Sequence, residues 1–103
     1  MTEREAIEKM WEEQSDAAFP AACAGVEVSG VDLIRLDAKT AGCIGWFVRR
    51  SGPLPEEKRS LLQQCIEALE RVLPDLSGPG KEYFERLWRL ASLVRRQSAP
   101  KPR

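Results

Sequence analysis

The sequence predicts a mainly α-helical fold: a compact four-helix domain around a buried central helix, with a possible short β-hairpin or extended element near residues 26–36. Apolar residues recur at helical spacing in segments that prolines and glycines separate. The composition, 43% hydrophobic and 31% charged, is typical of a globular domain, and 103 residues allow one core. We expect a single helical domain over residues 1–97 and a disordered basic tail over residues 98–103, which include two prolines.

The first helix is predicted from its N-terminal cap. Thr2 and Glu5 have the spacing of a capping box, in which each side chain accepts a hydrogen bond from the backbone of the other residue. The apolar stripe that follows is narrow and consists of Ala6, Ile7, Met10 and Trp11. A stripe this narrow indicates a helix that docks on a larger element. We expect the helix to end near Gln14 or Ser15, before a loop rich in small residues.

The second helix is expected to be the centre of the fold. Valines on either side of a Ser-Gly pair in residues 26–36 indicate a short hairpin before it. Asp37 is a favourable N-cap residue, so we predict the helix over residues 38–50. Residues 41–48 are apolar on all sides, a pattern typical of a buried helix.

The last two helices form an antiparallel helical hairpin in this interpretation. Pro55, followed by two glutamates, opens the third helix, because proline and acids favour the first turn. Pro74 ends it. Pro79 opens the fourth helix, which we expect to run to about Arg96.

No active site or metal site is predicted, and we expect no enzymatic activity, no cofactor and no catalytic residues. The chain has no histidine, which excludes Ser-His-Asp and Cys-His arrangements within one chain. Cys23, Cys43 and Cys65 lie 20 and 22 residues apart, without the spacing of a zinc site or a disulfide framework. Buried, reduced thiols are the expected state of all three.

Two pairs of glutamates give the strongest argument for an enzyme. Glu67 with Glu70, and Glu82 with Glu85, have the i, i+3 spacing of carboxylates that hold magnesium or iron between helices. Both pairs project away from the apolar faces of their helices. A magnesium-dependent enzyme is therefore the least favoured of three functional hypotheses, and it would require a dimer that brings the acids together.

The leading hypothesis is a small protein–protein interaction or regulatory module, forming a homodimer or binding a partner protein. The apolar arc of the fourth helix is wider than one neighbouring helix can cover, so the rest of the chain, a second subunit or a partner must cover the remainder. The candidate interface residues on this arc are Tyr83, Phe84, Leu87, Trp88, Leu90 and Leu93. Opposite charge also favours association, since residues 1–37 carry −6 and residues 81–103 carry +5.

The three tryptophans, Trp11, Trp46 and Trp88, come from three different predicted helices. We expect them to share one cluster in the core. The apolar arc around Trp88 leaves open whether that residue belongs to the core or to an interface.

The second hypothesis is an accessory protein that binds nucleic acid through the fourth helix and the tail. Its candidate basic surface consists of Arg86, Arg89, Arg95 and Arg96. The formal net charge of zero and the acidic N-terminal part argue against it. We therefore expect no nucleic-acid partner.

The expected localisation depends on two comparisons, one of the apolar runs with membrane spans and one of the N-terminus with targeting signals. No apolar run approaches the roughly 18–20 residues of a membrane span, so we expect no membrane partner. The acidic, amphipathic N-terminus resembles neither a secretory signal nor a transit peptide, which predicts a cytoplasmic protein. The 11 arginines against 5 lysines hint at a GC-rich bacterial gene.

Overall fold

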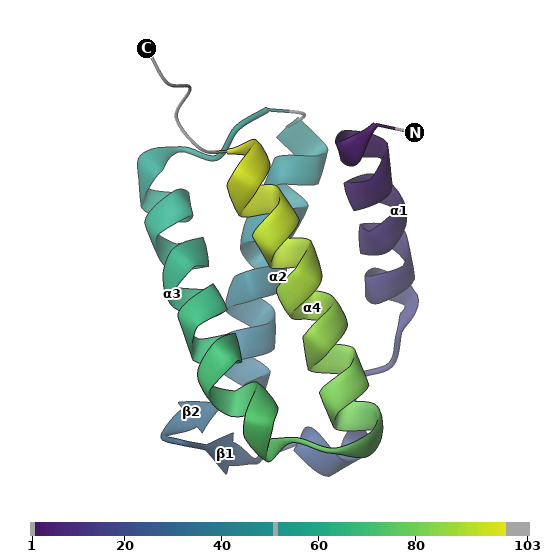
Figure 1. Ribbon diagram of the computed structural model, residues 1–103, viewed down its shortest axis with the longest axis vertical. Coiled ribbons are helices and arrows are strands. Elements are labelled where there is room, and N and C mark those ends of the chain that lie inside the picture. Colours follow the sequence, from purple (N-terminus) through teal and green to yellow (C-terminus); the bar gives the residue numbers. More distant parts are fainter. Residues whose placement is uncertain (1, 51, 99–103) are drawn as a thin grey trace.

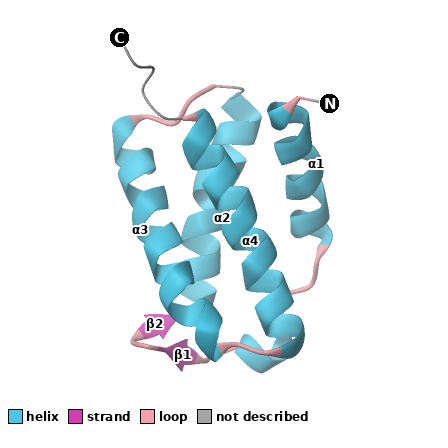
Figure 2. Ribbon diagram, viewed as in Figure 1, coloured by secondary structure: helices cyan, strands magenta, loops and turns pink. Residues whose placement is uncertain are grey.

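Four helices pack side by side, and a small hairpin closes one end of the bundle (Figure 1). The computed structural model describes residues 2–50 and 52–98. Its elements in chain order are α1 (Glu3–Asp16), η1 (Ala21–Cys23), β1 (Glu27–Val28), β2 (Val31–Asp32), α2 (Leu33–Arg50), α3 (Glu56–Val72), η2 (Leu73–Asp75) and α4 (Gly78–Gln97). Figure 2 shows that most of the chain is helical, which confirms the predicted mainly α fold with a short hairpin.

The start of α1 follows the predicted capping box. The hydroxyl of Thr2 accepts a hydrogen bond from the backbone N–H of Glu5 over 3.1 Å, and the Glu5 carboxylate accepts one from the backbone N–H of Thr2 over 3.3 Å. Two backbone donors of the first turn are thereby satisfied. Ile7, in the narrow apolar stripe, is fully buried against the rest of the bundle. The helix therefore docks through this stripe, as its sequence predicts.

The hairpin is shorter than the predicted segment, and α2 is correspondingly longer. The two strands pair Val28 with Val31. Ser29 and Gly30 form the turn with positive φ angles of 51° and 78°, as a two-residue hairpin turn requires. The predicted start of the helix at residue 38 is wrong, because Asp32 already caps it.

The cap geometry explains this early start. Oδ1 of Asp32 accepts a hydrogen bond from the backbone N–H of Arg35 over 3.0 Å, which satisfies a donor of the first turn of α2. Asp37 is consequently a residue inside the helix, and its side chain is free to make a contact elsewhere. Leu33 and Leu36, expected in the extended segment, lie on the buried face of the helix.

The core lies where α2, α3 and α4 meet, and α1 adds a fourth wall. In Figure 1, α4 lies in front of α2, with α3 and α1 on either side. The fully buried large side chains include Phe47, Phe84, Ile44, Leu69 and Leu87, which come from the three longer helices. Because α4 packs against each of the other three helices, most of its large apolar side chains are buried.

The second helix is central, but the expectation that it is buried on all sides is wrong. Ala38, Lys39 and Gly42 are exposed. A Cβ atom at Gly42 would meet nothing within 4 Å, and Lys39 borders an open depression that α2 shares with α3. The helix α1 covers α2 only near its C-terminal half. There the ring of Trp11 approaches Gly45, and the Arg4 guanidinium lies 5.1 Å from the centre of the Phe47 ring.

The aromatic cluster of the core differs from the expected one. Phe19, Tyr83 and Phe84 form edge-to-face pairs with ring centroids 5.2–5.9 Å apart. The three tryptophans are each only partly buried and pack at the edge of the core. The residue that the sequence argument missed is Phe19, which the loop after α1 brings back onto α4.

The domain extends one residue beyond its predicted end. Ser98 is 2% exposed, and its hydroxyl accepts a hydrogen bond from the backbone N–H of Leu54 over 3.1 Å. Its carbonyl accepts a bond from Arg59 over 3.5 Å. Ser98 is therefore part of the packed domain, and the rest of the predicted tail, residues 99–103, lies outside the described residues.

Among the helices that the structure describes, none has the length and apolar character needed to cross a membrane.

Candidate functional site

Most of the predicted interface on α4 lies inside the core. Tyr83, Phe84, Leu87 and Leu90 are between 0% and 6% exposed, covered by the other helices of the same chain. The wide apolar arc therefore reflects the three neighbours of α4. Trp88 and Leu93 are the two predicted interface residues that remain partly exposed.

Trp88 borders a shallow depression between the end of α3 and the first half of α4. Its indole N–H donates a hydrogen bond to the Glu70 carboxylate over 3.3 Å, so the ring is fixed against α3. Leu73 and Pro74 form the apolar part of this depression, and the charged residues Lys81, Glu85 and Arg89 also line it. This contact within the chain accounts for the position of Trp88.

The predicted basic surface on α4 does not form one patch. Each of its four arginines has a different neighbour. Arg89 pairs with Glu85 at 2.8 Å, and Arg86 donates to the Gln14 side chain over 3.4 Å. Arg96 lies 3.7 Å from Glu3 of α1, while Arg95 donates to the Gln63 side chain over 2.7 Å. Arg86 and Arg89 thus lie in the middle of α4, where they border a depression with two glutamates, whereas Arg95 and Arg96 lie in its last turn.

A polar link inside the bundle joins α2 to α4. The hydroxyl of Tyr83 donates a hydrogen bond to Asp37 over 2.8 Å. Burial raises the pKa of the Asp37 carboxyl above its ordinary value, and the bond from Tyr83 partly offsets this. Burial and the neighbouring carboxylate raise the pKa of Tyr83 as well. The phenol therefore stays protonated and keeps donating, so the pair acts as a structural contact.

The two glutamate pairs lie on the outside of their helices and the three cysteines are buried, as the sequence predicts. Glu67, Glu70 and Glu82 are exposed, and Glu85 is half-buried beside Arg89, so both pairs face outward as predicted. The three cysteines are buried free thiols. Within residues 2–50 and 52–98, no group of three or more cysteine, aspartate or glutamate side chains is arranged to hold a metal ion.

The largest exposed apolar side chains lie at the hairpin end of α2. Ile34 is 48% exposed and Val26, just before β1, is 36% exposed. Ala38 and Gly42 follow Ile34 at spacings of four residues, so the three lie along one line of the helix surface. A Cβ atom added at Gly42 would meet nothing within 4 Å. We call Val26, Ile34, Ala38 and Gly42 the α2 surface.

The exposed charges on α2 itself have one sign, whereas the hairpin before it adds two exposed acids, Glu27 and Asp32. The exposed charged residues of α2 are Arg35, Lys39, Arg49 and Arg50, and its single acid, Asp37, turns toward Tyr83. The outer side of α1 has the opposite character, since its exposed acids are Glu5, Glu8, Glu12, Glu13 and Asp16 against one exposed base, Lys9. Sequence reasoning missed the α2 surface because it expected this helix to be covered on all sides.

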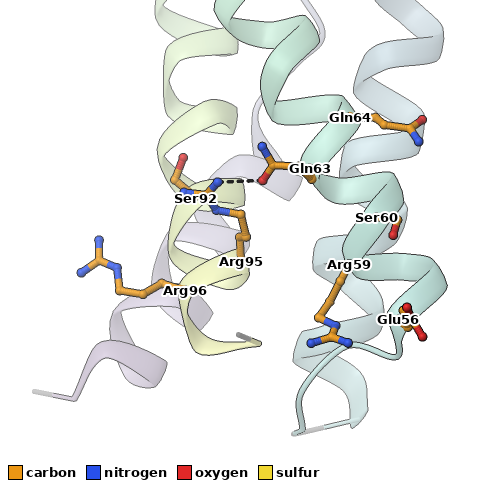
Figure 3. Close-up of a pocket in the computed structure, with 8 residues that line it drawn as sticks. All are labelled: Glu56, Arg59, Ser60, Gln63, Gln64, Ser92, Arg95 and Arg96. Carbon is orange, nitrogen blue, oxygen red and sulfur yellow. Dashed lines mark hydrogen bonds between the residues drawn. The ribbon is translucent and has the colours of Figure 1, made fainter. Parts of the chain in front are cut away.

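A second candidate site is an open groove between α3 and α4, lined by polar and charged residues, with a volume of about 810 Å³. Figure 3 shows its lining residues, which come from the first half of α3 and the last turns of α4. They are Glu56, Arg59, Ser60, Gln63, Gln64, Ser92, Arg95 and Arg96. Only two of its residues, Arg95 and Arg96, were part of the predicted basic surface.

Comparison with protein-family models, with curated proteins and with solved structures finds no match to this chain. The functional argument therefore depends on the surfaces of the molecule itself.

Proposed function

We propose that the protein is a small interaction or regulatory module without catalytic activity, and that it forms a homodimer through the α2 surface. The observation that carries this proposal is Ile34, a large apolar side chain left 48% exposed on a helix that is otherwise central to the fold. Burying such a side chain completely contributes about 1.5–3 kcal/mol, so covering the exposed half adds roughly 1 kcal/mol per copy.

The shape of the α2 surface favours a helix as the occupant. Ala38 and Gly42 have little or no side chain, and the space beyond Gly42 is open. Two helices that meet at such residues can approach to the short end of the roughly 8–10 Å range of helix packing. Ile34 lies at one end of this line, where a partner helix would cover it.

Charge complementarity supports a second copy as that partner. The exposed charged residues of α2 are basic, with Arg35 and Lys39 next to Ile34 and Ala38 in the sequence, and the outer side of α1 is acidic. The hairpin acids Glu27 and Asp32 lie at the hairpin end of this surface, before α2 begins. In a dimer with two-fold symmetry every contact is made twice, so α1 of each copy meets α2 of the other. Attraction between opposite surfaces adds to association and sets its orientation.

We place this module in the cytoplasm of a bacterial cell. The support is its three free thiols, because a reducing compartment keeps cysteines in that state.

The test is the molar mass in solution, measured by light scattering after size-exclusion chromatography. We expect a dimer for the natural chain and a monomer for Ile34→Glu, which places a charge in the interface. We also expect a monomer for Gly42→Gln, whose side chain blocks close approach. Because glutamine favours a helix over glycine by about 0.5–1 kcal/mol, this second variant should unfold at a higher temperature as a monomer than Ile34→Glu does.

The control is Glu82→Gln, an equally exposed position on α4, which should remain a dimer with unchanged mass. A natural chain that stays monomeric at high micromolar concentration contradicts the proposal. A second outcome also contradicts the proposal. The natural chain would be a monomer that binds DNA or RNA with a steep salt dependence, and Arg35→Gln would lose this binding. The basic residues of α2 would then bind nucleic acid and not a second copy.

A further inference from the structure

The groove between α3 and α4 lies on the side of the bundle away from the α2 surface. In Figure 1, α3 and α4 are in front of α2. A ligand in this groove therefore does not compete with a second copy on α2. The two proposals rest on different residues and fail independently.

Two arginines in the groove have no ion-pair partner among residues 2–50 and 52–98. Arg59 reaches from α3 and Arg95 from α4, so positive charge enters the groove from both walls (Figure 3). The recorded partners of both are neutral: Arg59 donates to the backbone carbonyl of Ser98 over 3.5 Å, and Arg95 donates to the amide oxygen of Gln63 over 2.7 Å. Neither forms an ion pair with a carboxylate in the described part of the chain.

The remaining charges of the groove leave this excess in place. Glu56 is its one acid, and it lies in the first turn of α3, where the helix dipole is positive. Arg96 is at the rim and turns toward Glu3 of α1, 3.7 Å away, as its outward direction in Figure 3 shows. The groove therefore has two guanidinium groups without an ion-pair partner in the described part of the chain, and one exposed carboxylate.

The other lining residues suit a ligand with several oxygen atoms. Ser60 and Ser92 have hydroxyl groups that donate and accept, and Gln63 and Gln64 have amide groups that do both. The bond to Gln63 fixes the Arg95 side chain and uses one of its five N–H donors, so the others remain available. A volume of about 810 Å³ is in the range of pockets that hold small molecules.

We propose that this groove binds a small organic anion through its phosphate or carboxylate group, with Arg59 and Arg95 as the principal binding residues. The guanidinium group is planar and presents paired N–H donors that match both oxyanions. The proposed ligand is a phosphorylated or polycarboxylate metabolite, because Arg59 and Arg95 have no ion-pair partner among the described residues.

The experiment titrates the natural chain separately with inorganic phosphate and with citrate, followed by NMR of backbone amides and by calorimetry. We expect saturable shifts at Ser60, Gln63 and Ser92 with at least one of the two probes. The probe that binds more tightly identifies the group as phosphate or carboxylate. Shifts at these residues that never saturate with either probe, or no shifts at all, contradict the proposal.

The variants separate a built site from general attraction of anions. Arg95→Gln should weaken binding at least about tenfold, as the loss of a charge-assisted hydrogen bond does. Arg59→Gln should do the same while its unfolding temperature is monitored, because Arg59 also contacts Ser98. The matched control is Arg71→Gln, which removes the same charge from the far end of α3 and should change the affinity less than about twofold. Equal weakening in Arg71→Gln and Arg95→Gln overturns the proposal.

Discussion

The hydroxyl of Tyr83 on α4 donates a 2.8 Å hydrogen bond to Oδ1 of Asp37 on α2, joining residues 46 positions apart. The bond lies beside the core, and the same tyrosine is part of the aromatic cluster with Phe19 and Phe84. Burial disfavours the charged form of Asp37, so this carboxylate costs stability when it is ionised, although the bond from Tyr83 reduces that cost. The bond therefore joins α2 to α4, while the burial of the ionised Asp37 carboxylate lowers the stability of the fold.

The first prediction concerns Asp37→Asn and the pH dependence of unfolding. The folded chain raises the pKa of Asp37 above 3.8, so its contribution to stability is fully present at lower pH and is lost as the pH rises through the raised value. Asparagine keeps an oxygen that accepts from Tyr83 and never ionises. We expect this variant to be at least as stable as the natural chain at pH 7.

The measurement is denaturant unfolding of both chains from pH 3 to pH 8. The difference in stability should grow in favour of Asp37→Asn as the pH rises and reach a plateau above the raised pKa of Asp37. The other carboxylates contribute equally to the free energy of unfolding of both chains, so their contributions cancel in the difference. A constant difference would contradict the prediction, because it would mean that folding leaves the pKa of Asp37 unchanged. A difference that grows in favour of the natural chain would show that the ionised carboxylate is the favoured partner of Tyr83.

The second prediction concerns the contact between α4 and η1. A Cβ atom at Gly80 would lie 2.9 Å from the sulfur of buried Cys23. Gly80→Ala should therefore destabilise the fold by about 1–3 kcal/mol, as overpacking does, although alanine favours a helix over glycine. Gly42→Ala is the matched control, since its added Cβ meets open space and should stabilise the monomer by about 0.5–1 kcal/mol.

A double variant tests the cause. Cys23→Ala removes the sulfur that the new methyl group would meet, so the loss in Gly80→Ala should be smaller in that background. The coupling between the two substitutions should be on the order of 1 kcal/mol. Additive effects would place the cost of Gly80→Ala somewhere other than Cys23.

The limits of the sequence argument come from particular residues. The helices and their order follow from local signals such as the capping box of Thr2 and the prolines between helices. The start of α2 does not follow from such signals, because Asp32 and Asp37 are both favourable N-cap residues when only their neighbours in the sequence are considered. The hairpin decides between them, since its second strand ends at Asp32 and the helix can begin at once.

The candidate site depends on which helix covers which, and periodicity does not contain that information. The wide arc of α4 indicated an interface, but α1 docks beside α4 and helps to cover it. The apolar residues of α2 indicated burial, yet α1 reaches only its C-terminal half and leaves Ile34 exposed. The groove residue Arg59 has no motif around it. Arg59 lines the same groove as Arg95 only because α3 packs against α4.

The third prediction concerns the buried thiols of Cys43 and Cys65. Burial raises the pKa of both, and alkylating reagents attack the thiolate. In the folded chain at pH 8 we expect iodoacetamide to react with these two residues far more slowly than in urea. Mass spectrometry of digested samples measures each site separately. Fast reaction of Cys65 in the folded chain would mean that α2 and α3 open locally at this point.

The last prediction tests the C-terminal boundary of the domain at Ser98. Its hydroxyl accepts the hydrogen bond of the buried backbone N–H of Leu54, so Ser98→Ala leaves that donor without a partner. An unsatisfied buried donor costs about 1–3 kcal/mol, and unfolding in denaturant should show a loss of this size. Ser60→Ala, at an exposed serine of α3, should change stability by less than about 0.5 kcal/mol. If both substitutions are equally neutral, Ser98 belongs to the tail, and the packed domain ends at residue 97, where the sequence alone places it.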